Sequence, residues 1–100
     1  MNGAQRTLVT VVTEAALEPL LTKDFAQFEV HGYTVVDARG WGESGVRDAG
    51  WDATANIRIE IVCKPEAAAA LIDHLQATYY ANFAMVVFTS EVHVLRAEKF

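Results

Sequence analysis

The chain has 100 residues, of which 52% are hydrophobic and only two are proline, so we expect one folded domain over residues 1–100. The formal net charge of -5 excludes a typical nucleic-acid binder, because affinity for phosphate backbones needs clustered Lys and Arg, and the 8 basic residues here are scattered. No apolar run approaches the roughly 20 residues of a membrane helix, and no signal segment opens the chain, so we expect a soluble cytoplasmic protein.

The first half of the chain alternates between β-rich and helical segments. Residues 7–13 are dense in β-branched side chains and predict a strand. The next segment carries apolar residues at the three-and-four spacing of a helical face, which fall at Leu17, Leu20, Leu21, Phe25 and Phe28. Pro19 suits its first turn, and His31-Gly32 closes the helix. Residues 33–39 are again β-rich and predict a second strand.

The second half repeats this order. Residues 55–63 alternate, which predicts a third strand with its apolar face made by Ile57, Ile59, Ile61 and Cys63. Pro65 suits the start of a second helix. The apolar face of this helix falls at Ala68, Leu71, Ile72, Leu75 and Tyr79, and we expect it to end within residues 80–82. Residues 84–94 predict the last strand, and we expect Phe83, Met85 and Phe88 in the core.

The order strand, helix, strand, strand, helix, strand predicts a ferredoxin-like βαββαβ domain of the α+β class. Two helices would cover one face of a four-stranded antiparallel sheet. The first and last strands are apolar at consecutive positions, as in Leu8-Val9 and residues 85–88, and such strands are buried on both faces. Since nothing else in the chain is left to cover the second face, we expect neighbouring subunits to cover it.

A long loop at about residues 41–54 separates the second and third strands, where a hairpin needs two to five residues. Four glycines, Ser44 and Arg47 lie in residues 40–51. Glycines let backbone N–H groups converge on an anion, and Arg47 with Arg39 has the fork geometry that phosphate oxygens prefer. The alternative is a flexible connection with a solvated Arg47.

Three stretches of the chain resemble PII signalling proteins. They are residues 32–42 (GYTVVDARGWG), residues 56–62 (NIRIEIV), and residues 82–88 (NFAMVVF) with the strand at residues 91–95. The likeness runs from Thr7 to the C-terminus. It is greatest to the PII-like proteins encoded beside bicarbonate transporters and carboxysome genes.

This resemblance implies a homotrimer with nucleotide sites in the clefts between subunits, each capped by the loop at about 41–54, called the T-loop. Thr34 would lie near the adenosine, Glu60 at the ribose, and Gly40 and Gly42 at the phosphates. Ser44, Gly45 and Arg47 would order around the phosphate, and Arg96 or Lys99 near the chain end would touch it, with fraying of that end as the alternative.

Two departures from the PII pattern bear on the ligand. Glu43-Ser44 replaces an Arg-Gln pair, which argues against the uridylylated tyrosine and the 2-oxoglutarate site of other PII proteins. Residues 79–83 (YYANF) replace a loop rich in glycine and lysine that wraps the outer phosphates of ATP. We therefore expect AMP, ADP or cyclic AMP rather than ATP, with bicarbonate as a co-ligand by analogy. The resemblance implies a bicarbonate transporter or a carboxysome-related protein as partner.

Other roles remain open for several residues. Glu60 could instead pair with Arg58 between subunits, and Trp41 and Trp51 could anchor a partner or fold back on the loop. The three histidines lack the spacing of a metal face, and no nucleophile is paired with a base, so we expect neither metal site, cofactor nor enzyme. The rival readings are a small oligomeric ferredoxin-like enzyme with slow nucleotide hydrolysis and a trimeric metal-binding protein.

Overall fold

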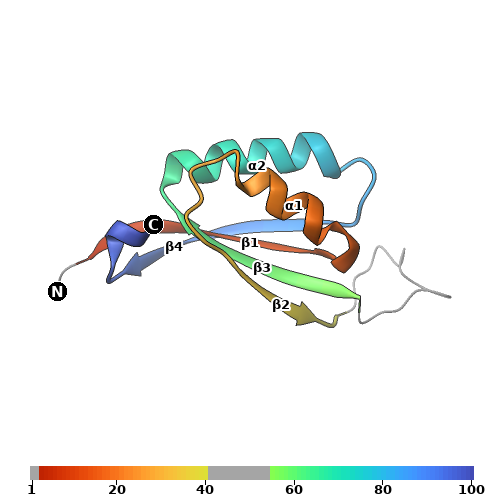
Figure 1. Ribbon diagram of the computed structural model, residues 1–100, viewed down its shortest axis with the longest axis horizontal. Coiled ribbons are helices and arrows are strands. Elements are labelled where there is room, and N and C mark those ends of the chain that lie inside the picture. Colours follow the sequence, from red (N-terminus) through yellow and green to blue (C-terminus); the bar gives the residue numbers. More distant parts are fainter. Residues whose placement is uncertain (1–2, 41–54) are drawn as a thin grey trace.

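The computed structural model describes residues 3–40 and 55–100, and the order of its strands and α-helices is the predicted βαββαβ (Figure 1). The elements are β1 (Ala4–Glu14), η1 (Ala15–Leu17), α1 (Glu18–Phe25), β2 (Thr34–Ala38), β3 (Asn56–Cys63), α2 (Pro65–Tyr79), β4 (Val86–Val94) and η2 (Ala97–Lys99). Both α-helices have a proline at their first or second position, where the missing N–H would have no partner in the helix.

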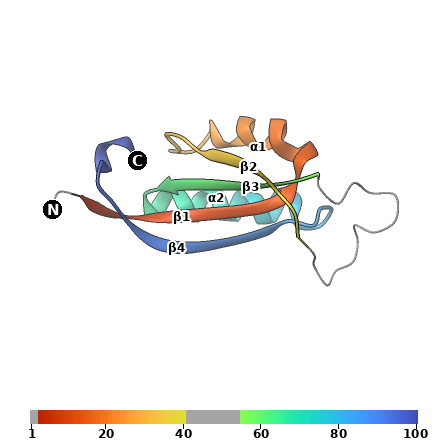
Figure 2. The same ribbon diagram turned by 90° about the horizontal axis from the view of Figure 1, so that it is seen from below.

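The four strands form one antiparallel sheet in the order β2-β3-β1-β4. Both α-helices lie on the same face of this sheet, as the two views show together (Figures 1 and 2). The register sets Glu60 of β3 between Thr34 of β2 and Thr10 of β1, and it sets Thr10 beside Phe88 of β4. One row of side chains therefore crosses all four strands.

The core lies between the sheet and the helices. Ile57, Ile59, Ile61 and Cys63 are buried, as the alternation of β3 predicted. Leu20, by contrast, is 51% exposed, so its assignment to the buried helical face was wrong. The buried positions of this region are Leu17, Leu21 and Phe25, spaced four apart, because α1 is short and contacts the sheet along one narrow stripe.

The sheet face opposite the helices exposes large apolar side chains. Val36 is 49% exposed, Val86 56% and Phe88 49%. The expectation of Phe88 in the core is therefore wrong within one chain, because the alternation of β4 turns it away from the helices. Met85 is buried and Phe83 packs partly buried against the core, as expected.

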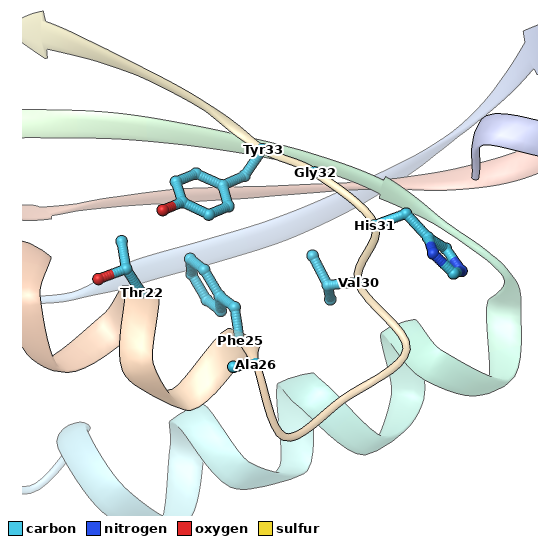
Figure 3. A pocket seen from close by; sticks show the side chains of 7 residues that line it. All are labelled: Thr22, Phe25, Ala26, Val30, His31, Gly32 and Tyr33. Carbon is cyan, nitrogen blue, oxygen red and sulfur yellow. The ribbon is translucent and has the colours of Figure 1, made fainter.

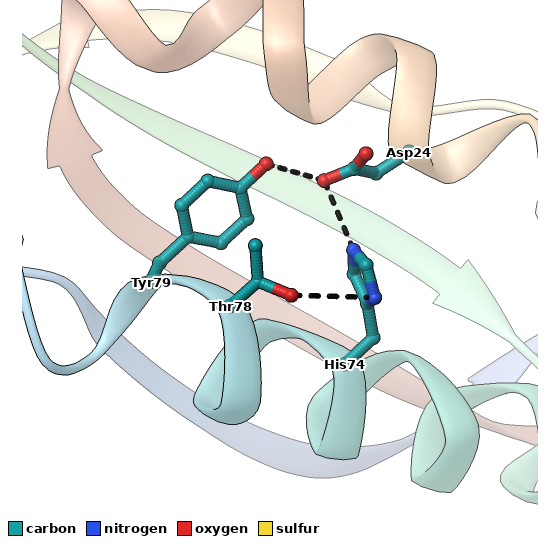
Figure 4. A network of polar contacts seen from close by, with 4 residues as sticks. All are labelled: Asp24, His74, Thr78 and Tyr79. Carbon is teal, nitrogen blue, oxygen red and sulfur yellow. Dashed lines mark hydrogen bonds and ion pairs between the residues drawn. The ribbon is translucent and has the colours of Figure 1, made fainter.

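A polar network joins α1 to α2 (Figure 4). The hydroxyl of Tyr79 donates a hydrogen bond to Oδ2 of Asp24. The Nε2 atom of His74 lies 3.1 Å from the same oxygen, without the alignment of a hydrogen bond, and Nδ1 lies 3.5 Å from the hydroxyl of Thr78. The ring of His74 also packs against Phe28, with 5.4 Å between ring centroids. His74 thus helps to hold the two helices together.

This network predicts a loss of stability at alkaline pH. Burial first, and then the hydrogen bond and the charge of Asp24, raise the pKa of Tyr79 to about 12, against about 10 in an unfolded chain. Between these pH values the folded chain keeps a proton that the unfolded chain has lost, so the free energy of unfolding falls as pH rises. The contribution is complete below about pH 10 and is lost by about pH 12, and it amounts to at most about 2.7 kcal/mol.

Urea unfolding of the wild type and Tyr79→Phe from pH 8 to pH 11.5 tests this. The wild type should lose more stability over this range than the variant. Tyr80→Phe is the matched control because Tyr80 is exposed at the end of the same helix, and it should behave like the wild type. Equal losses in the wild type and Tyr79→Phe would contradict the assigned role.

Candidate functional site

Thr34 and Glu60, which the resemblance to PII proteins assigns to one site, lie directly opposite each other on β2 and β3. Directly opposite residues of an antiparallel pair have Cβ atoms about 5 Å apart and share one face, here the face away from the helices. Thr10, buried, lies on the other side of Glu60. The open face thus presents a carboxylate between two hydroxyl-bearing residues, a group that can accept hydrogen bonds from a sugar.

Arg58 lies two residues before Glu60 on the same face, and its Nη2 atom is 3.2 Å from Oε2 of Glu60. Both side chains are nearly half exposed, so the pair contributes about 1 kcal/mol or less in this chain. A carboxylate has two oxygens and about four acceptor positions, so pairing with Arg58 leaves capacity for a ligand. The ion pair lies within one strand, and a pair between subunits stays a prediction.

Gly40 stands two residues beyond the end of β2. Apart from its neighbours in the chain, no described residue would lie within 4 Å of a Cβ atom added there. Four other predicted site residues and both tryptophans follow it and lie outside the described residues: Trp41, Gly42, Ser44, Gly45, Arg47 and Trp51.

The end of β4, which Arg96 follows, lies at the opposite end of the sheet from the end of β2, which Gly40 follows (Figure 1). The register pairs Ala38 with Asn56 and Asn56 with Glu14, at the end of β1, whereas Val94 pairs with Ala4, at its start. The ten residue steps of β1 between these ends span about 30 Å. Gly40 and Arg96 of one chain therefore cannot contact the same phosphate group.

The segment around Arg96 is held by a residue that the sequence reasoning missed. Arg6 of β1 donates from Nε to the carbonyl oxygen of Phe100 at 3.0 Å and from Nη2 to that of Ala97 at 3.2 Å. These contacts join residues more than 90 positions apart, and no local pattern in the sequence signals them.

A pocket of about 200 Å³ lies between the end of α1 and the segment that leads into β2 (Figure 3). Its lining residues are Thr22, Phe25, Ala26, Val30, His31, Gly32 and Tyr33. The ring of Tyr33 meets Phe25 of the core edge-on, whereas the neighbouring Thr34 points to the other face of the sheet. The pocket is thus separate from the Thr34–Glu60 pair, and it is smaller than the roughly 300 Å³ at which ligand pockets begin.

The remaining reactive groups of the described residues do not gather into a site. Cys63 is buried, and burial raises the pKa of its thiol, so the reactive thiolate is disfavoured. No three His, Cys, Asp or Glu side chains among residues 3–40 and 55–100 lie together in a way that could hold a metal ion. Within the same residues, neither α-helix has the length and apolar character needed to cross a membrane.

Comparisons with known proteins agree with this architecture. The family model of nitrogen regulatory protein P-II matches residues 6–99. A PII-like signalling protein from Thermus thermophilus is 34% identical, with a TM-score of 0.85 over 100% of this chain and 99% of the other.

Two more distant structures share the fold. CPII, a nitrogen regulatory PII-like protein from Thiomonas intermedia K12 bound to ADP, AMP and bicarbonate, is 24% identical, with a TM-score of 0.85 over 99% of this chain and 96% of the other. The complex of Bacillus subtilis GlnK with ATP is 17% identical, with a TM-score of 0.67 over 88% of this chain and 82% of the other. The family match over nearly the whole chain and the 34% identity show that the protein belongs to the nitrogen regulatory protein P-II family.

Proposed function

We propose that this protein is a trimeric regulator that binds an adenine nucleotide between subunits and signals through its T-loop. The observation that carries the proposal is the pairing of Thr34 with Glu60 on the open sheet face, in the strands that lead into and out of that loop. The proposed site joins Thr34, Gly40, Gly42, Ser44, Gly45, Arg47 and Glu60 of one subunit to Arg96 of its neighbour.

One observation supports assembly, and the proposed site requires it. Val36, Val86 and Phe88 are exposed on a face that no element of the described chain covers, and removing such apolar surface from water favours association. The sheet ends beyond which Gly40 and Arg96 lie are about 30 Å apart in one chain, so the proposed site, which contains both residues, requires a second copy. A closed ring of three subunits, as the family resemblance implies, would cover the open faces and create three equivalent sites.

The ligands of the similar structures support an adenine nucleotide. CPII holds ADP, AMP and bicarbonate, and GlnK holds ATP. Residues 79–83 of this chain contain neither lysine nor glycine, so they offer few donors to neutralise a third phosphate. We therefore place AMP, ADP or cyclic AMP ahead of ATP. Bicarbonate is the proposed co-ligand, and inorganic-carbon uptake or fixation the proposed process, with a bicarbonate transporter or carboxysome-related protein as partner.

The proposed mechanism is a switch without covalent chemistry. Nucleotide phosphate would order the T-loop through backbone N–H donors and Arg47, and the ordered or released loop would be read by a partner. Binding shifts the equilibrium between two loop states only by the difference in the ligand's affinity for those states. The protein in this account is a regulator and not an enzyme, and it needs no cofactor.

Calorimetry of the purified protein against AMP, ADP, ATP and cyclic AMP, each with and without bicarbonate, tests the function. About one nucleotide bound per subunit supports the proposal, and a change of affinity with bicarbonate would define the signal. Absence of binding to all four nucleotides would overturn it.

Arg47→Ala should weaken ADP binding about ten- to a hundredfold, because a charge-assisted hydrogen bond to phosphate contributes roughly 1.5 to 3 kcal/mol. The matched control is Lys23→Ala, which removes one positive charge at an exposed position of α1, on the side of the sheet that the helices cover. The control should keep the wild-type affinity. Unchanged affinity in Arg47→Ala would remove this residue from the site.

A further inference from the structure

Arg6 ties the two ends of the described chain together through its side chain. Its Nε and Nη2 atoms donate to the carbonyl oxygens of Phe100 and Ala97, and Nη1 donates to the carbonyl oxygen of Gln5 at 2.9 Å. The first two bonds are partly buried. Nε and Nη2 lie on one edge of the planar guanidinium, so two parallel donors fix the direction of the segment that they hold.

The η2 turn has little else to anchor it. It spans three residues, and none of them is buried. Its own backbone bonds run from Lys99 N–H to the Arg96 carbonyl at 3.0 Å and from Phe100 N–H to the Ala97 carbonyl at 3.1 Å. A single 3₁₀ turn of this kind is weak in isolation. The two bonds from Arg6 therefore set where the turn lies.

Arg96 is the residue that immediately precedes η2, and its carbonyl oxygen accepts the first bond of the turn. Holding the turn at Ala97 and Phe100 thus fixes the backbone from which the Arg96 side chain projects. We infer that Arg6 is a positioning residue, which holds η2 so that Arg96 reaches the phosphate of a nucleotide bound mainly by the neighbouring subunit. This inference rests on the proposed nucleotide function.

Two variants separate the charge of Arg6 from its geometry. Arg6→Lys keeps the charge but lacks the fork of two donors, and Arg6→Gln lacks both. Hydrogen exchange at the Lys99 and Phe100 amides reports the turn directly, with no nucleotide present. We expect faster exchange at both amides in both variants, and ADP affinity lowered about tenfold, as expected when one charge-assisted contact is misplaced.

A double-mutant cycle with Arg96→Ala distinguishes positioning from general destabilisation. If Arg6 acts through Arg96, Arg6→Gln should lower ADP affinity in the wild type but not further in Arg96→Ala, while exchange at the turn still rises. An equal loss of affinity in both backgrounds would overturn the inference. So would unchanged exchange, or faster exchange with unchanged affinity.

The same data separate this inference from the proposed function. If the wild-type protein binds ADP and Arg6→Gln binds it equally well, the nucleotide function stands and the positioning role falls. If the wild type binds none of the adenine nucleotides, both fall, whatever the exchange rates show.

Discussion

If the protein forms the proposed trimer, replacing Phe88 by aspartate is expected to convert it into folded monomers. Phe88 is 49% exposed on the open face, in the same row as Thr10, Glu60 and Thr34, so it would lie inside the proposed assembly. Aspartate removes the free energy that burial of an aromatic ring contributes to assembly. It also adds a carboxylate whose desolvation on assembly costs free energy. In a symmetric trimer the substitution is present at all three subunit interfaces.

Analytical ultracentrifugation over a range of concentrations measures this effect. The protein concentration at which half of the subunits are assembled should rise at least about a hundredfold. Thr89→Asp is the matched control, because it adds the same charge at the next exposed position of β4, on the opposite face. A trimer that survives Phe88→Asp would show that the open face is not the interface. Circular dichroism should show the native fold in both variants.

Mixing two defective subunits is expected to restore nucleotide sites. Glu60→Gln would damage the proposed ribose contact of its own site, and Arg96→Ala the proposed phosphate contact of the neighbour's site, so each variant alone should bind ADP at least about tenfold more weakly. In a cyclic trimer that contains both subunits, one site always combines a wild-type Glu60 with a wild-type Arg96. Random mixing in equal amounts should therefore restore about a quarter of all sites.

The experiment uses co-expression with two different tags, followed by calorimetry with ADP. Its control mixes Glu60→Gln with the double variant Glu60→Gln, Arg96→Ala, because no arrangement of these subunits contains an intact Glu60. The control should recover nothing. No recovery in the first mixture would mean that Glu60 and Arg96 do not share one site across a subunit boundary.

The sequence alone was sufficient for the order and the type of the elements, because these depend on local periodicity. The period of two in residues 57–63 determines which of these β3 side chains are buried, and Pro65 with a period of 3.6 marks α2. Thr34 and Glu60 were assigned to one nucleotide site through the PII resemblance, whereas their pairing on β2 and β3 comes from the sheet register. The shared nucleotide site stays a prediction.

Contacts between distant parts of the chain were decided only by the tertiary structure. Leu20 and Phe88 are apolar residues in apolar segments, and their exposure follows from the narrow contact of α1 and from the direction of the β4 pleat. The link from Tyr79 to Asp24 crosses 55 residues. The bonds of Arg6 cross 91 and 94 residues, and the separation of Gly40 from Arg96 depends on the register of the whole sheet. Local patterns specify faces and periods, but the pairing of remote side chains depends on how the packed elements meet in space.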